Sequence, residues 1–207
     1  MRRVHPIEEE SYRVMRELVD LSRFGPLSRA VTERVIHASA DLEYAESLVL
    51  DEIALEGGLE ALRHGASIVT DVSMVAAGIT ARKTCCYVSD PRARGLSDEL
   101  DVTRSAAGFR LAAEEVGPGA VWVVGNAPTA LFELLDLDAD PVLVIGLPVG
   151  FVGAAESKEE LLKSGLPTIA NRGPKGGSGV AAAALNALIY YEENRREKPD
   201  HRKERSR

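Results

Sequence analysis

The chain has 207 residues, of which 45% are apolar and 28% are charged, a composition typical of one globular domain with a substantial core. No apolar run reaches the roughly 18 residues that a bilayer crossing needs, and the N-terminus lacks the apolar segment of a signal peptide, so we expect a cytoplasmic protein with no membrane role. The last sixteen residues hold seven Lys or Arg and five Asp or Glu, which leaves 18 basic and 27 acidic residues in the rest, an acidic body that argues against nucleic acid as a partner.

The first third of the chain is predicted to be helical. Apolar residues recur at helical spacing over residues 7–21, and the same pattern continues over residues 28–38 and 43–63. The last of these helices is expected to end near His64.

Short apolar runs rich in β-branched residues follow. Continuous runs of this kind are typical of strands that are buried on both faces of a parallel sheet. Five strands are predicted, at residues 66–72, 85–90, 120–126, 141–147 and 167–171. Cys85 and Cys86, the only cysteines, would point to opposite faces of the second strand, which rules out a shared metal and favours two buried small side chains.

Helices are predicted between most of these strands. Residues 103–116 are Ala-rich and amphipathic, residues 127–136 follow Asn126 as an N-cap, and Ser157 opens a capping box. A closing helix is expected over residues 178–195. The alternation predicts an α/β fold, a doubly wound parallel sheet of five strands with a helical N-terminal segment. We expect one domain over residues 1–191 and a charged, disordered tail over residues 192–207.

Four loops are expected to surround one crevice, because ligands of doubly wound sheets bind beyond the carboxyl ends of the strands. Gly lets backbone approach a ligand closely, and free N–H groups at helix starts attract anions, so together the loops predict a site for an anionic ligand. For any single loop, ordinary turn chemistry explains the same Gly and Pro residues, and no nucleotide-binding motif is present. The loops are residues 71–82, 125–129, 147–158 and 171–178.

His37 is the one candidate acid or base. His5 and His201 lie near the ends of the chain, and His64 stands at a helix end where a cation needs no function to explain it. By itself, a structural histidine at the end of an apolar helix is the better interpretation of His37 as well. The residues alone therefore predict a crevice but no reaction.

Several segments, in this order and spacing over about residues 7–190, resemble the precorrin-8X methylmutase (cobalt-precorrin-8 methylmutase) family. They are Arg34-Val-Ile-His37, Asp71-Val-Ser-Met-Val-Ala-Ala-Gly78, Thr103-Arg104-Ser105, Gly125-Asn-Ala-Pro-Thr-Ala-Leu131, Pro148-Val-Gly-Phe-Val-Gly153 and Lys175-Gly-Gly-Ser178. The resemblance implies a three-layer, flavodoxin-like fold and a homodimer with active sites near the subunit interface. It also implies an isomerase of cobalamin biosynthesis that needs no cofactor or metal.

The implied reaction moves a methyl group from C-11 to C-12 of a tetrapyrrole and yields hydrogenobyrinate, or cobyrinate when cobalt is already present. The family's catalytic histidine matches His37, which reverses the interpretation of that residue taken alone. Histidine ionises near neutral pH and is suited to protonating a ring nitrogen, which makes the ring electron-poor. The product would pass to the next enzyme of the pathway.

The substrate carries several carboxylate arms, so an acidic protein must gather local donors. The family's contacts match Ser11, Thr80 and Arg104 by motif position. Further donors are expected from the loops, at Asn126, Lys158, Lys175, Gly176, Gly177 and Ser178. An Arg is the better clamp, because its planar fork binds both carboxylate oxygens.

The chain departs from the family pattern at two places. Ser39 and Ala40 stand where the family often has a small residue and then Gly, and Ala81-Arg82-Lys83 replaces an Arg directly after Thr80. Two other functions stay open at this point: a non-catalytic tetrapyrrole carrier of the same fold, and a nucleotide-binding flavodoxin-like domain that would rest only on the Gly-rich loops.

Overall fold

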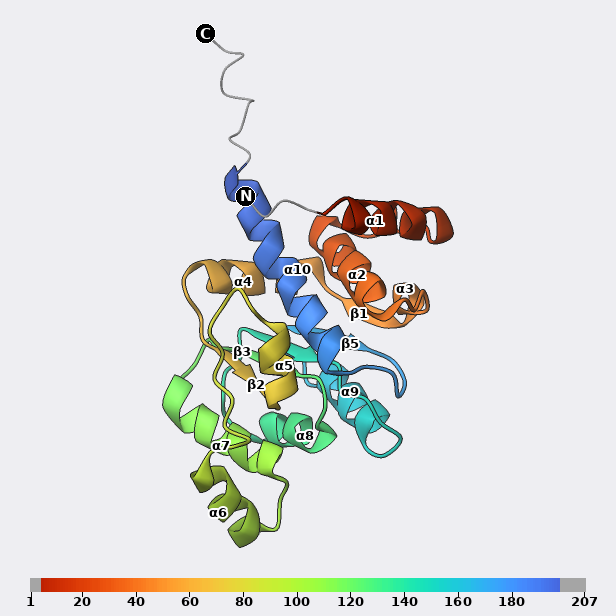
Figure 1. The fold of residues 1–207 in the computed structure, drawn as a ribbon. Coiled ribbons are helices and arrows are strands. Elements are labelled where there is room, and N and C mark those ends of the chain that lie inside the picture. The colour runs from red at the N-terminus through yellow and green to blue at the C-terminus, as the bar shows by residue number, and fades with distance from the viewer. Residues whose placement is uncertain (1–4, 198–207) are drawn as a thin grey trace.

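A five-stranded sheet lies between two layers of helices in the computed structural model, which describes residues 5–197 (Figure 1). The strand order is β1-β5-β4-β3-β2; β2 to β5 run parallel, and β1 runs antiparallel to β5. The strands are β1 (Leu48–Leu50), β2 (Ile68–Thr70), β3 (Val121–Val124), β4 (Leu143–Gly146) and β5 (Thr168–Asn171). The sheet is therefore mixed, and the prediction of a purely parallel sheet was wrong.

Helices cover both faces of the sheet. They are α1 (Pro6–Leu18), α2 (Pro26–Ser39), α3 (Tyr44–Ser47), α4 (Glu52–Arg63), α5 (Ser73–Gly78), α6 (Pro91–Leu100), α7 (Arg104–Val116), α8 (Pro128–Asp136), α9 (Ala154–Lys163) and α10 (Ser178–Glu197). The layer with α2, α4, α5 and α10 packs on one face, and α7, α8 and α9 pack on the other. Helix α1 lies outside α2, and α6 lies outside α7 (Figure 1).

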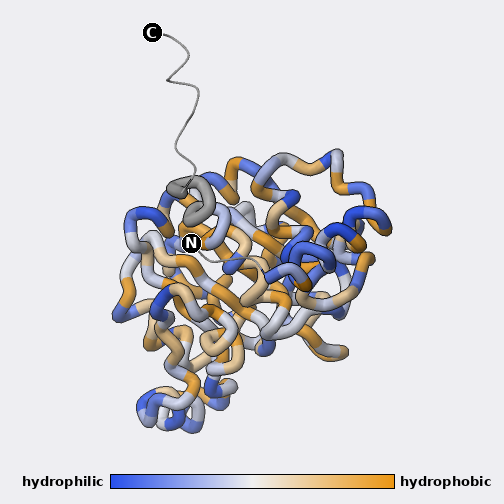
Figure 2. The backbone as a smooth tube through the Cα atoms, turned by 45° about the horizontal axis from the view of Figure 1, so that its top comes forward, coloured by the Kyte–Doolittle hydropathy of each residue, from blue (hydrophilic) through white to orange (hydrophobic). Residues whose placement is uncertain are grey.

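Two cores result from the alternation of side chains along each strand. In β3, Val121 and Val123 join the core beneath α2, α4 and α10, whereas Trp122 and Val124 join the core beneath α7, α8 and α9. Figure 2 shows the corresponding hydropathy, with apolar residues concentrated inside the molecule and polar ones along its periphery.

The predicted helix over residues 43–63 is interrupted by β1. Asp51 follows this short strand and starts α4, because its carboxylate accepts a hydrogen bond from the backbone N–H of Ala54 at 2.9 Å. Only Val49 in β1 is β-branched, so the segment carries little strand signal of its own. Pairing with the edge of β5 turns it into a strand.

The predicted strand over residues 85–90 is reduced to one bridge. Cys85 pairs in parallel with Val69 and donates its N–H to the Ile68 carbonyl at 2.7 Å. The chain then turns, because the carboxylate of Asp90 caps α6 and Pro91 occupies its first position. Both cysteines are half-buried rather than fully buried.

Several helices begin or end at residues other than those predicted. The N-cap of α8 is Ala127 rather than Asn126, and α9 begins at Ala154, so Ser157 lies inside its first turn instead of opening a capping box. Helix α10 extends to Glu197, beyond the predicted start of the disordered tail; residues 198–207, with His201, lie outside the described residues. The predictions for residues 28–38, 103–116 and 127–136 are confirmed to within two residues at each end. No helix within residues 5–197 is both long and apolar enough to cross a bilayer.

Candidate active site

The loops at the carboxyl ends of the parallel strands meet, as predicted. The N–H of Gly150 donates to the carbonyl of Pro174 at 3.1 Å, and the N–H of Gly177 donates to the carbonyl of Leu147 at 2.9 Å. A Cβ on Gly125 would lie 2.8 Å from the Cα of Ser178, so these two loops are also in contact. Loops from three strands and the start of α10 therefore form one edge of the molecule.

Asp71 closes the loop that follows β3. Its buried carboxylate accepts hydrogen bonds from the backbone N–H groups of Gly125 at 3.2 Å, Asn126 at 2.8 Å and Ala127 at 2.7 Å. Burial raises the pKa of Asp71, while these three donors act to lower it. These three N–H groups are thus bonded within the protein and are not free to bind a substrate anion in this structure.

His37 lies in the last turn of α2 and is held by α1. The hydroxyl of Ser11 is 3.1 Å from Nδ1 of His37, and the ring of Tyr12 stacks on the imidazole with centroids 4.6 Å apart and planes 11° apart. No residue that the structure describes bonds the other ring nitrogen, Nε2. The imidazole is half-buried, so it is oriented by α1 yet accessible on one side.

Polar and apolar contacts fasten α1 to α2. Arg34 of α2 donates to a carboxylate oxygen of Glu8 at 2.8 Å and to the Tyr12 hydroxyl at 3.2 Å. Arg16 binds the nearly buried Glu33 with two hydrogen bonds, at 2.9 and 2.7 Å, and Met15 is buried against the core. The placement of Ser11 beside His37 follows from this packing.

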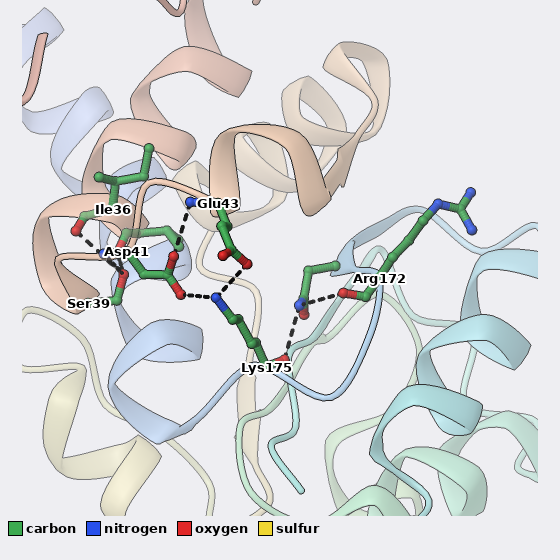
Figure 3. Close-up of polar contacts among 8 residues, drawn as sticks. Ile36, Ser39, Asp41, Glu43, Arg172 and Lys175 are labelled. Atoms are coloured by element: carbon green, nitrogen blue, oxygen red, sulfur yellow. Dashed lines mark hydrogen bonds and ion pairs between the residues drawn. The ribbon is translucent and has the colours of Figure 1, made fainter. Parts of the chain in front are cut away.

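Lys175 bridges the loop after β5 to the turn after α2 (Figure 3). Its ammonium lies 2.6 Å from Oδ2 of Asp41 and 2.7 Å from Oε2 of Glu43. The hydrogen bond from Lys175 lowers the pKa of Asp41, and the two carboxylates raise the pKa of Lys175. Lys175 is therefore a neutralised cation in this structure and not the free anion clamp that was expected.

Lys158 is fully buried in α9. Its ammonium donates to Oδ1 of Asn171 at 3.0 Å and to the carbonyl of Lys175 at 2.6 Å. Burial lowers the pKa of Lys158 to about 8. Because the side chain points into the protein, we no longer assign it a direct contact with substrate.

Arg104 and Asn126 are exposed at this edge of the molecule. Thr80 is exposed too, but it follows α5, and residues 82–85 line a hollow with residues 65–68 at the start of β2, so the second half of the predicted loop 71–82 leaves this edge. Arg104 begins α7, whose N-cap Thr103 accepts a hydrogen bond from the N–H of Ala106. The alternative pairing of Arg104 with Asp98 or Asp101 does not form among the described residues. Thr103 contacts Thr129 of α8 through their hydroxyls, 2.7 Å apart, which joins the starts of α7 and α8.

The Gly-rich start of α10 is shaped by close packing. A Cβ on Gly176 would lie 2.2 Å from the Leu147 carbonyl oxygen, so no other residue fits there without a shift of backbone. Gly177 has a φ of 133°, which L side chains rarely adopt, and Ser178 is nearly buried. These three residues directly follow Lys175, and their contact with a substrate stays a prediction.

A hollow of about 810 Å³ lies at the opposite edge of the sheet, near Pro118, Asp140 and Ser164, and none of the predicted site residues lines it. Within residues 5–197, no three His, Cys, Asp or Glu side chains cluster closely enough to hold a metal ion.

Three residues of this arrangement were missed from sequence. Asp71, Asn171 and Asp41 each join segments that are distant along the chain. Asp71 directly follows an apolar strand, and Asn171 ends one. A polar residue at the end of an apolar strand is a weak signal that its side chain binds the loops there. Asp41 offered no signal beyond its place after His37.

The sequence as a whole matches one family model. The model is that of precorrin-8X methylmutase, and the match spans residues 6–191. The chain belongs to the precorrin-8X methylmutase family. The family makes it an isomerase, a methylmutase of cobalamin biosynthesis.

Individual relatives agree with this membership. The cobalt-precorrin-8 methylmutase of Methanothermobacter thermautotrophicus is 44% identical, over 89% of this chain and 92% of its own. The precorrin-8X methylmutase of a Sinorhizobium species is 40% identical, over 88% of this chain and 92% of its own. The crystal structure of the precorrin-8X methylmutase from Thermus thermophilus superposes with a TM-score of 0.83 at 35% identity, covering 92% of this chain and 98% of that one.

The family departure at Ala40 has a structural counterpart. Ala40 caps α2 with a φ of 54° and a ψ of 26°, the left-handed conformation that Gly adopts without steric cost. The same turn leads directly to Asp41, so the helix that carries His37 ends in the geometry that a Gly would favour.

Proposed function

We propose that the protein moves a methyl group from C-11 to C-12 of precorrin-8X or cobalt-precorrin-8, and so forms hydrogenobyrinate or cobyrinate. Membership of the family supports the reaction, and relatives named for both substrates support either form. The shift is intramolecular: one C–C bond breaks at C-11 and one forms at C-12, and the atoms of substrate and product are the same.

The observation that carries this proposal is the setting of His37. Its imidazole is oriented by the Ser11 hydroxyl and the Tyr12 ring, while Nε2 remains open. A proton lent from Nε2 to a ring nitrogen of the substrate would draw electrons from the macrocycle and ease migration of the methyl group; it would return to His37 afterwards. Positioned proton transfer of this kind typically contributes about 10²–10⁴ in rate.

Binding is proposed to depend on donors at the carboxyl edge of the sheet. Arg104 is exposed without an ion-pair partner among the described residues, and its place at the start of α7 adds the partial positive charge of a helix N-terminus. Asn126 offers an exposed hydrogen-bonding side chain at this edge, and α10 begins at Ser178, directly after Gly176 and Gly177. Thr80, also exposed, would contact the substrate from the segment that follows α5. These groups suit the carboxylate arms of a tetrapyrrole.

A homodimer is part of the proposal. The α1 stripe consists of Ile7, Val14 and Leu18. Val14 and Leu18 follow Ile7 by seven and eleven residues, so the three side chains share one face of α1. Ile7 is 74% exposed and Leu18 is 65% exposed, which is unusual for side chains of this size. Ser11 lies on the same helix, so a second copy covering the stripe would approach His37.

We further propose that the fold is a flavodoxin-like variant. With Cys85 placed beside β2, the parallel part of the sheet has the chain order 2-1-3-4-5, which is the flavodoxin-like order. A cytoplasmic location and transfer of product to the next enzyme of the pathway complete the proposal.

One experiment separates this function from a carrier of the same fold. Purified protein is mixed with precorrin-8X, and the absorption spectrum is followed in time. Catalytic conversion of excess substrate supports the isomerase. A static spectral shift that saturates at one ligand per site, without product, would contradict it and favour the carrier.

A further inference from the structure

The buried ammonium of Lys158 has no place in the proposed chemistry. It carries a charge without a carboxylate partner among the described residues, and both of its hydrogen-bond acceptors are neutral oxygens. Burial of an unpaired charge is costly, so a residue of this kind calls for an explanation. Its two acceptors lie in the strand end and loop that lead to Lys175.

The Lys158 ammonium binds the backbone of the loop over residues 172–177. The carbonyl of Lys175 receives the Lys158 ammonium at 2.6 Å and the side-chain amide of Asn171 at 3.0 Å. The same amide also donates to the carbonyl of Arg172 at 3.2 Å. Two carbonyls of the loop, those of Arg172 and Lys175, are thus held by Asn171, and the second of them is also held by the charged Lys158.

The Lys175 side chain then crosses to the end of α2. It binds the carboxylates of Asp41, which follows His37 by four residues, and of Glu43 (Figure 3). The backbone N–H of Glu43 also donates to the Asp41 carboxylate at 3.0 Å. Contacts therefore run without a break from Lys158 to the turn that ends the helix of His37. Ser11 and Tyr12 hold the imidazole from the other side.

We propose that Lys158 is a positioning residue, which sets the place of His37 through the 172–177 loop and the Lys175–Asp41 ion pair. It touches neither His37 nor the substrate. Removal of the Lys158 ammonium is therefore expected to reduce local order in two segments, 172–177 and 38–43. Of these two segments, Lys158 contacts the first.

Hydrogen exchange measured by mass spectrometry tests this placement without use of the reaction. Lys158→Met keeps an unbranched apolar side chain and removes the donor. The control is Lys163→Met on the same helix, where the lysine side chain is 67% exposed and pairs with Glu160. In Lys158→Met we expect exchange about tenfold faster in both segments, as for the loss of a hydrogen bond to a charged group, and no change in Lys163→Met.

The order of the contacts is tested by adding Lys175→Met. Lys175→Met alone should accelerate hydrogen exchange in residues 38–43. In the double variant, Lys158→Met should then have no further effect on exchange in that segment. Wild-type exchange of 38–43 in Lys158→Met would overturn the proposal, and so would an effect that persists undiminished in the double variant. If Lys158→Met does not fold, Lys158→Gln, which is one atom shorter than lysine and carries a neutral amide, replaces it under the same criteria.

The kinetic part rests on the proposed function. Lys158→Met should lower kcat about tenfold and leave KM nearly unchanged, because a displaced acid affects the chemical step more than binding. A rise in KM alone would contradict positioning of His37. A wild-type protein without methylmutase activity would refute the proposed function, while the exchange measurements would still decide the placement.

Discussion

The hydroxyl of Ser11 and Nδ1 of His37 lie 3.1 Å apart, although 26 residues separate them in the chain. The contact joins the outermost helix, α1, to the end of α2 and gives the imidazole a defined orientation. A histidine held in this way presents Nδ1 to its partner and leaves Nε2 without a partner among the described residues.

Removal of the imidazole should abolish turnover without loss of the fold. We expect His37→Asn to lower kcat by about 10²–10⁴, the usual contribution of a positioned acid, and to leave product binding within a factor of about two. Ser11→Ala should lower kcat by a smaller factor. The control is His64→Asn at the exposed end of α4. Wild-type rates in His37→Asn would remove the residue from the mechanism, and weaker product binding in Ser11→Ala at full kcat would assign the hydroxyl to the substrate instead.

Arg104 should contribute to binding more than to the chemical step, because a carboxylate arm is held before and after the methyl group moves. Arg104→Ala is expected to weaken binding of hydrogenobyrinate by about 1.5–3 kcal/mol, and Arg104→Lys should also weaken it, since a point charge cannot form a two-pronged contact. Titration of product into both variants measures this. Arg94→Ala on the exposed side of α6 is the control, and equal affinity in all proteins would return Arg104 to the status of a surface residue.

Ala40 should limit stability. Its left-handed backbone is strained for a residue with a Cβ, so Ala40→Gly is expected to raise the free energy of unfolding by up to about 1 kcal/mol. Ala38→Gly, at an exposed position within α2, should lower it by about 0.5–1 kcal/mol, because Gly is a poor helix former. Urea denaturation of the two variants gives both values; a decrease of similar size in each would show that the cap is not strained.

The α1 stripe should mediate self-association. Leu18→Glu places a charge on this stripe and is expected to convert a dimer to a monomer of about 22 kDa, as measured by light scattering. Ile53→Glu, on α4, changes a side chain that is 79% exposed and should leave the mass unchanged. If wild type is already a monomer at micromolar concentration with full activity, the proposed interface does not exist.

Lys158 should make stability depend on pH. Its folded pKa of about 8 lies below the ordinary value of 10.5, so between these values the unfolded chain binds more protons and the free energy of unfolding rises with pH. From pH 7 to pH 10, the free energy of unfolding of wild type should therefore rise by about 2 kcal/mol relative to that of Lys158→Met. A difference that is constant over this range would show that Lys158 is not protonated with a lowered pKa.

The sequence by itself determined the elements whose signals are local. Strands β2 to β5 are continuous apolar runs, and α7 begins where Thr103 can cap it, so their positions depend on residues a few places apart. The family motifs located His37 and Arg104 as candidates. They said nothing of how those side chains are held.

Only the tertiary structure decided which polar groups meet. Asp71 binds loop N–H groups 54 to 56 residues away, and Lys175 binds Asp41 at a separation of 134 residues. It also turned residues 48–50 into a strand, because β5 presented a free edge, and it buried Lys158 instead of presenting it to a substrate. A carboxylate or an ammonium carries the same sequence signal whether it faces solvent, substrate or another side chain, and packing of distant segments selects among these partners.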